Sequence, residues 1–136
     1  MQAPAKRKVL IVDDERDLVE TLVIRLGASD GFVVETAEDG ETGLVKARAF
    51  MPDVILLDIS LPGIQGWEFC RRLRANPMTR DIRVVIMTAW LPNGFTNQIE
   101  KTRPTRVLLK PFDEKELLDA LYAATPADGL KWQADT

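Results

Sequence analysis

Five residues of this chain carry side chains suited to the transfer of a phosphoryl group, and each lies at the end of a short apolar run. Asp13 and Asp14 follow the first run and Asp58 follows the third. Thr88 ends the fourth run and Lys110 follows the fifth. Because the carboxyl ends of parallel strands meet at one edge of a sheet, where ligands bind, we expect these side chains to lie close together.

Three carboxylates at one sheet edge would repel one another strongly unless a cation lay among them. The chain has no histidine and one cysteine, so its candidate ligands are oxygen atoms, which favours Mg²⁺ or Mn²⁺. Thr88 supplies a hydroxyl group and Lys110 a mobile positive charge, which together could hold the oxygens of a phosphoryl group in transfer. Asp58 could then be the attacking nucleophile.

The elements that must position these residues are predicted from periodicity. Residues 54–57 contain no polar side chain, which is typical of a central strand covered on both faces. We predict strands at residues 8–12, 32–36, 54–57, 83–88 and 107–109. We predict helices at residues 17–26, about 40–50, 65–75 and after the capping residue Asp113, and residues 95–102 could form a further short helix.

This alternation of strand and helix predicts an α/β fold. Right-handed crossovers place the helices on both faces of a five-stranded parallel sheet, which gives a three-layer α/β/α sandwich. The 136 residues, 46% of them hydrophobic, are enough for one domain with a single core.

Composition narrows the classes of function. A net charge of −3 gives no reason to expect nucleic acid as a partner. Cys70 is the single cysteine, so there is no disulfide framework. The apolar run at residues 9–12 is too short for a signal peptide or a membrane span. A cytoplasmic location without membrane insertion is therefore expected.

Four motifs occur in order along the chain: Val-Leu-Ile-Val-Asp13-Asp14-Glu, Asp53-Val-Ile-Leu-Leu-Asp58-Ile-Ser-Leu-Pro-Gly, Val-Val-Ile-Met-Thr88-Ala89 and Leu-Leu-Lys110-Pro-Phe. Together they resemble the receiver domain of bacterial two-component response regulators over residues 7–124. The resemblance implies a flavodoxin-like fold. Residues 1–6 are then expected to form an N-terminal tail and residues 125–136 a C-terminal tail or linker.

The resemblance also implies a signalling function. Asp58 would accept a phosphoryl group from a sensor histidine kinase, a phosphotransfer protein or a small donor such as acetyl phosphate. Phosphorylation would switch the surface around the fourth and fifth strand-helix units and so control an output protein or a missing output domain. Such a domain catalyses only its own phosphorylation and dephosphorylation, and would be a monomer or a phosphorylation-linked dimer.

The family pattern assigns roles around the metal ion. Asp14 and Asp58 would bind Mg²⁺ directly, together with the backbone carbonyl of Ser60, and Asp13 would act mostly through water. Mn²⁺ could replace Mg²⁺ at such a site.

The resemblance implies that Thr88 and Lys110 contact the phosphoryl group and that the Lys110-Pro111 peptide bond is cis. In many receivers an aromatic residue lies three positions before this lysine and changes rotamer with the threonine. Val107 occupies that position here, so the coupling to an output is expected to differ.

Residues 90–105 also depart from the family pattern and suggest two hypotheses. Trp90 would overhang the site and hinder attack of water on the acyl phosphate. A basic group would bind a partner; it comprises Lys101, Arg103 and Arg106.

Other interpretations stay open at this point. Taken singly, the paired aspartates could cap a helix, and Asp58 could belong to a turn. Thr88 could satisfy a strand end, and Lys110 could be a solvated surface lysine. For the whole chain, the main alternative is a receiver-like dimerisation or docking module that works without phosphorylation. An aspartyl-phosphate phosphatase of the haloacid-dehalogenase type lacks its Asp-x-Asp-Gly-Thr signature here, and flavin binding lacks a Ser/Thr-rich phosphate loop.

Overall fold

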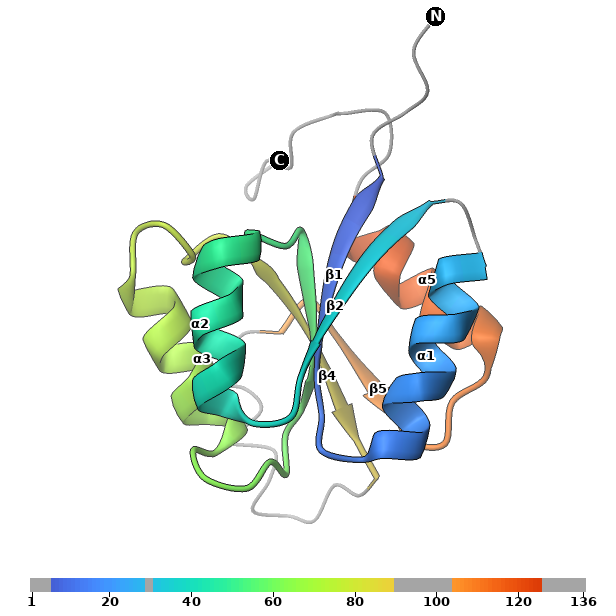
Figure 1. Cartoon of the computed structure of the whole chain (residues 1–136), viewed down its shortest axis with the longest axis horizontal. Coiled ribbons are helices and arrows are strands. Elements are labelled where there is room, and N and C mark those ends of the chain that lie inside the picture. The colour runs from blue at the N-terminus through green and yellow to red at the C-terminus, as the bar shows by residue number, and fades with distance from the viewer. Residues whose placement is uncertain (1–5, 29–30, 90–103, 126–136) are drawn as a thin grey trace, which may run out of the picture.

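The computed structural model of the chain describes residues 6–28, 31–89 and 104–125. The elements follow one another as β1 (Arg7–Val12), α1 (Arg16–Ala28), β2 (Phe32–Ala37), α2 (Gly40–Phe50), β3 (Val54–Asp58), α3 (Gly66–Ala75), β4 (Arg83–Thr88), β5 (Arg106–Leu109) and α5 (Glu114–Ala124) (Figure 1). Each strand agrees with its predicted range to within one residue at either end. The possible helix at residues 95–102 lies outside the described residues.

The strands form one parallel sheet in the order β2-β1-β3-β4-β5, so β3 lies at its centre. Helices α1 and α5 cover one face, and α2 and α3 cover the other (Figure 1). The predicted three-layer α/β/α fold is therefore confirmed. No helix in the described ranges is long and apolar enough to cross a membrane.

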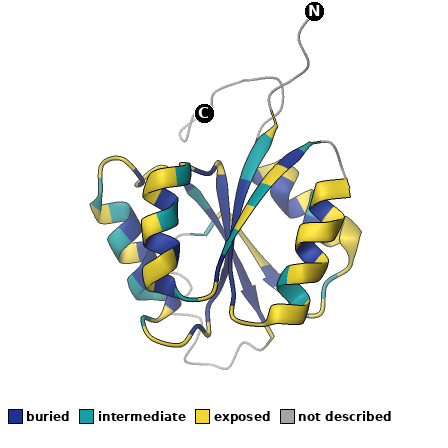
Figure 2. Cartoon of the chain, viewed as in Figure 1, coloured by how far each residue is buried: buried dark blue, intermediate teal, exposed yellow. Residues whose placement is uncertain are grey.

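The centre of the sheet is buried on both faces, which explains why β3 carries no polar residue before its end (Figure 2). Successive side chains of a strand point to opposite faces. Accordingly, Ile55 and Leu57 belong to the core under α2 and α3, whereas Val54 and Leu56 belong to the core under α1 and α5. The hydrophobic effect thus fixes the position of Asp58, because the four apolar residues before it must be covered from both sides.

Helix α3 carries two aromatic residues near one face, and only one of them enters the core. Phe69 is fully buried, whereas Trp67 is only partly buried and donates a hydrogen bond from Nε1 to Gln65 Oε1 at 2.8 Å. A Cβ atom added to Gly43 of α2 would lie 3.0 Å from Phe69 Cε2 and 3.1 Å from the side chain of Val12. The glycine therefore lets α2 approach the sheet closely beside this ring.

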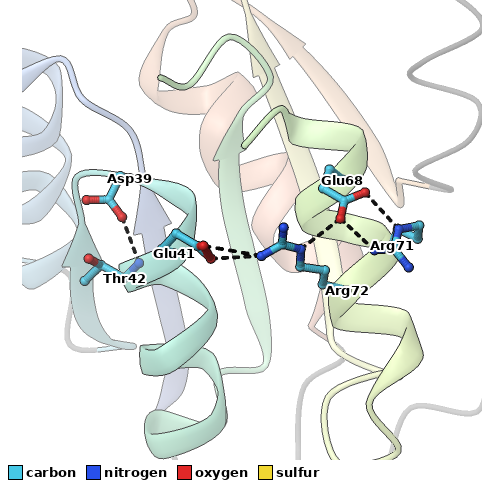
Figure 3. A network of polar contacts seen from close by, with 6 residues as sticks. All are labelled: Asp39, Glu41, Thr42, Glu68, Arg71 and Arg72. Carbon is cyan, nitrogen blue, oxygen red and sulfur yellow. Dashed lines mark hydrogen bonds and ion pairs between the residues drawn. The ribbon is translucent and has the colours of Figure 1, made fainter. Parts of the chain in front are cut away.

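Helices α2 and α3 are joined at the surface by a network of charged side chains (Figure 3). Arg72 of α3 bonds to Glu41 of α2 at 2.9 Å and to Glu68 of its own helix at 2.8 Å. Hydrogen bonds from Arg71 and Arg72 lower the pKa of Glu68 to about 2. Asp39 caps α2 by accepting a hydrogen bond from the third helical N–H at 2.8 Å. At the other end of the chain, the predicted cap of α5 is confirmed by a full capping box at Asp113.

The thiol of Cys70 is expected to be unreactive in the folded protein. Its side chain is buried, and burial raises the pKa of the thiol to about 12, so almost no thiolate exists at pH 8. An aromatic disulfide reagent should therefore react with no thiol in native buffer and with one thiol per chain in urea. Rapid labelling of the native protein would show that α3 opens readily.

Candidate functional site

The register of the sheet brings the ends of four strands to one edge, which is the lower edge in Figure 1. Asp58 is the last residue of β3, and Thr88 lies one position beyond its pairing partner on β4. Asp13 directly follows β1, whose last residue pairs with the residue before Asp58. The backbone N–H of Lys110 donates to the Thr88 carbonyl at 2.7 Å, which carries the β5 end alongside β4.

Three aspartates meet at this edge. One carboxylate oxygen each from Asp13, Asp14 and Asp58 lies within 4.8 Å of the others. Asp13 and Asp58 are buried, while Asp14 is exposed. Asp13 Oδ1 accepts a hydrogen bond from the backbone N–H of Glu15 at 2.8 Å, and Asp58 Oδ1 accepts one from Ser60 at 2.9 Å. These two turns fix the orientation of the buried carboxylates.

The ammonium group of Lys110 lies among these acids. Its Nζ atom is 2.9 Å from Asp13 Oδ2, 3.1 Å from Glu15 Oε1 and 3.6 Å from Asp58 Oδ2. The Lys110 side chain is only 13% exposed, so this positive charge is held largely away from solvent. Lys110 therefore offsets part of the repulsion among the carboxylates.

The surroundings of Asp58 disfavour its ionised form relative to a carboxyl group in water. Burial raises the pKa of Asp58 above its ordinary value, and the nearby charges of Asp13 and Asp14 raise it further. The hydrogen bond from Ser60 and the charge of Lys110 oppose this rise without cancelling it. An additional positive charge beside Asp58 would stabilise the carboxylate, as a divalent cation does.

Lys110 stays protonated in spite of its burial. Burial alone would lower the pKa of its ammonium group, but the hydrogen bond to Asp13 and the charge of Asp58 outweigh this effect and raise the pKa. The site therefore presents a fixed cation next to the candidate nucleophile over the whole physiological pH range.

An open groove of about 300 Å³ runs from the two N-terminal aspartates along the start of α1 and the end of β2. Arg16 and Glu38 face each other across it at 3.7 Å, and both side chains are exposed. The lining residues are Asp13, Asp14, Arg16, Val19, Glu20, Thr36, Ala37 and Glu38.

Three local features shape the loops of the site. A Cβ atom on Gly66 would lie 3.0 Å from Ile59 Cα, so the glycine lets α3 begin directly behind the loop that carries Ser60. Gly63 has φ +81°, a conformation that other residues rarely adopt. The Lys110-Pro111 peptide bond is cis, as predicted.

The comparison with protein families decides the identity of the chain. Residues 9–122 match the model of the response regulator receiver domain. The chain belongs to this family. As a receiver domain, it is a component of two-component signalling.

Curated relatives of this receiver domain have similar sequences. It is 37% identical to the response regulator PleD of Caulobacter vibrioides over 118 residues, which are 87% of this chain and 26% of PleD. It is 39% identical to the response regulator GacA of Pseudomonas syringae over 117 residues, which are 84% of this chain and 53% of GacA. The chain thus spans from about a quarter to about half the length of these relatives.

Solved structures agree with this assignment. Chemotaxis protein CheY4 of Vibrio cholerae superimposes with a TM-score of 0.81 at 30% identity, covering 88% of this chain and 99% of that one. A putative response regulator from Chloroflexus aurantiacus gives a TM-score of 0.80 at 29% identity, with coverage of 88% and 97%.

The structure brings together most of the residues that the sequence analysis selected. Asp13, Asp14, Asp58 and Lys110 form one cluster, and Thr88 is buried at the adjoining strand end. Ser60 contacts Asp58 through its N–H group. The individual roles of these residues in metal binding and phosphoryl transfer stay predictions.

Glu15 is a member of the cluster that the sequence analysis did not select. The available signal was its place as the third acid in the run Asp13-Asp14-Glu15, directly after the first strand.

The two hypotheses on residues 90–105 concern a segment that is mostly undescribed. Of their residues, Trp90, Lys101 and Arg103 lie outside the described residues. Arg106 is exposed on β5, and Val107 is 37% exposed there.

Proposed function

We propose that this receiver domain accepts a phosphoryl group on Asp58 in a reaction that depends on Mg²⁺. The observation that carries the proposal is the arrangement around Asp58, in which three carboxylates lie within 4.8 Å and the Lys110 ammonium group is 3.6 Å away. A candidate nucleophile, a set of oxygen donors that suits a metal ion and a cation thus lie at one sheet edge. This combination suits phosphoryl transfer better than a helix cap or a turn, which needs one carboxylate.

The residues of the cluster fit Mg²⁺ because their donors are oxygen atoms, which this ion prefers. We assign its binding to Asp13, Asp14 and Asp58, with the backbone carbonyl of Ser60 as a further ligand; Mn²⁺ would fit the same donors. The bound ion would neutralise charge on the carboxylates and on the phosphoryl oxygens.

The chain's own residues would perform the transfer. A carboxylate oxygen of Asp58 forms a bond to phosphorus, and the bond from phosphorus to the leaving group breaks. The leaving group is the imidazole nitrogen of a phosphohistidine or the carboxylate of acetyl phosphate, and it departs with the bonding electron pair. Lys110 and the Thr88 hydroxyl would contact the phosphoryl oxygens as their charge develops.

The biological donor in this proposal is a sensor histidine kinase or a phosphotransfer protein. Residues 7–124 would form the switch, between an N-terminal tail (1–6) and a C-terminal tail or linker (125–136). On phosphorylation, the surface around the fourth and fifth strand-helix units would control an output protein or an output domain. The protein would act as a monomer or as a phosphorylation-linked dimer. One relative is named as the phosphate regulon transcriptional regulatory protein PhoB of Rhizobium meliloti, so the output of that protein is transcription.

Incubation with acetyl phosphate and Mg²⁺, followed by intact-mass measurement, tests this function. We expect a gain of one phosphoryl group, about 80 Da, that is absent in Asp58→Asn and in EDTA. A gain that persists in Asp58→Asn would place the phosphoryl group elsewhere. If the chain shows no mass gain and also fails to bind beryllofluoride, a phosphoryl mimic, the result would support a docking module that works without phosphorylation.

A further inference from the structure

Glu15 differs from the other two carboxylates around Lys110 in its exposure to solvent. The Asp13 side chain is fully buried and that of Asp58 is 9% exposed, whereas the Glu15 side chain is 64% exposed. Its contact with Lys110 therefore joins a buried cation to a solvated anion. Such a contact can be exchanged at low cost, because water replaces the lysine at the carboxylate.

The hydrogen bonds of Lys110 favour the Asp13 side of the site. An ammonium group has three N–H donors, and that of Lys110 donates hydrogen bonds to Asp13 and Glu15. The 3.6 Å separation from Asp58 is an ion pair without a hydrogen bond. A phosphoryl group on Asp58 adds negative oxygens that attract the same ammonium group, so these oxygens would compete with its present partners for Lys110.

Separating Lys110 from Asp13 would cost more free energy than separating it from Glu15. Asp13 is buried, and losing its cation would leave an uncompensated charge away from water. Glu15 is largely solvated, so it is the partner that Lys110 can leave. Its backbone N–H stays bound to Asp13 Oδ1, so the turn need not move when the side chain swings away.

We propose that Glu15 is a positioning residue that keeps the Lys110 ammonium group beyond hydrogen-bonding distance of Asp58 in the unphosphorylated protein and releases it when a phosphoryl group arrives. The proposal rests on the phosphorylation of Asp58 proposed above. Glu15 competes with the phosphoryl oxygens for the ammonium group and thereby weakens the binding of a phosphoryl group. The weakening is limited to what an exposed ion pair can contribute, which is up to about fivefold in an equilibrium constant.

Two substitutions separate this contact from a simple repulsion between negative charges. Glu15→Gln removes the charge and the ion pair together. Glu15→Asp keeps the charge but shortens the side chain by one carbon–carbon bond, about 1.5 Å, which is enough to break a 3.1 Å contact. Asp17→Asn is the matched control, because Asp17 is an exposed acid in the first turn of α1, two residues further along the chain.

The test measures the dissociation constant of beryllofluoride at saturating Mg²⁺ by calorimetry, on the full chain and the three variants. We expect Glu15→Gln and Glu15→Asp to lower this constant by about two- to fivefold and Asp17→Asn to leave it unchanged. The free energy of unfolding in urea should be equal in all four proteins. That equality separates a positioning role from a structural one.

Each other outcome overturns the proposal in a recognisable way. Tighter binding in Glu15→Gln but not in Glu15→Asp would show charge repulsion without a contact, as would an equal effect of Asp17→Asn. Unchanged or weaker binding in both Glu15 variants would show that the residue does not hold Lys110 back. If the wild-type chain neither binds beryllofluoride nor gains a phosphoryl group, the function proposed for Asp58 fails together with the role of Glu15.

Discussion

Replacing Lys110 with alanine is expected to slow phosphoryl transfer to Asp58 by about 10²–10³-fold while strengthening the binding of Mg²⁺. The transfer slows because the variant loses the cation that lies 3.6 Å from Asp58 Oδ2 and faces the developing charge. Metal binding improves because the ammonium group, 2.9 Å from Asp13, competes with the metal for the same carboxylates. Opposite changes in the two quantities distinguish this role from a general disruption of the site.

Two measurements test this prediction. The first is the initial rate of mass gain from acetyl phosphate at saturating Mg²⁺, and the second is the dissociation constant of Mg²⁺ without a phosphoryl donor. Lys115→Ala is the matched control, since Lys115 is an 83% exposed lysine on α5 that pairs with Asp119. The control should leave both quantities unchanged. If Mg²⁺ binds more weakly to Lys110→Ala than to the wild type, the proposed competition does not occur.

Replacing Phe69 with alanine is expected to lower the free energy of unfolding by about 3–5 kcal/mol. The ring is fully buried between α2, α3 and the sheet, and Gly43 leaves the space that it fills. Truncation removes the buried ring and leaves a cavity, because the surrounding strands and helices can collapse only in part.

Urea unfolding followed by circular dichroism measures this loss. Trp67→Ala is the control, because the indole is partly exposed two residues away on the same helix, and its loss should cost about 1 kcal/mol or less. Equal losses in the two variants would mean that Trp67, rather than Phe69 alone, anchors α3. The contrast tests the assignment of the core residues in the structure.

The sequence determined the class of fold. Apolar runs without polar residues must be covered on both faces, and the alternation with helical periodicity leaves a parallel sheet as the solution. For this reason the strands at residues 83–88 and 54–57, with Thr88 ending the first and Asp58 directly after the second, could be placed from the residues alone, and the structure extends the second strand to Asp58. The same rule placed Asp13 and Lys110, which directly follow strands, and Asp14, which comes next after Asp13.

Only the tertiary structure decided how these parts meet. Periodicity cannot choose between two aromatic residues near one helix face, so Phe69 rather than Trp67 entered the core through its fit against Gly43. The partners of Lys110 depend on the register of β5 and on the turn after β1, which together bring Glu15 to 3.1 Å from its ammonium group. A sequence names the residue at each strand end, but distances between side chains arise from the packing of all layers. The raised pKa of Asp58 has the same origin, because burial by the whole fold produces it.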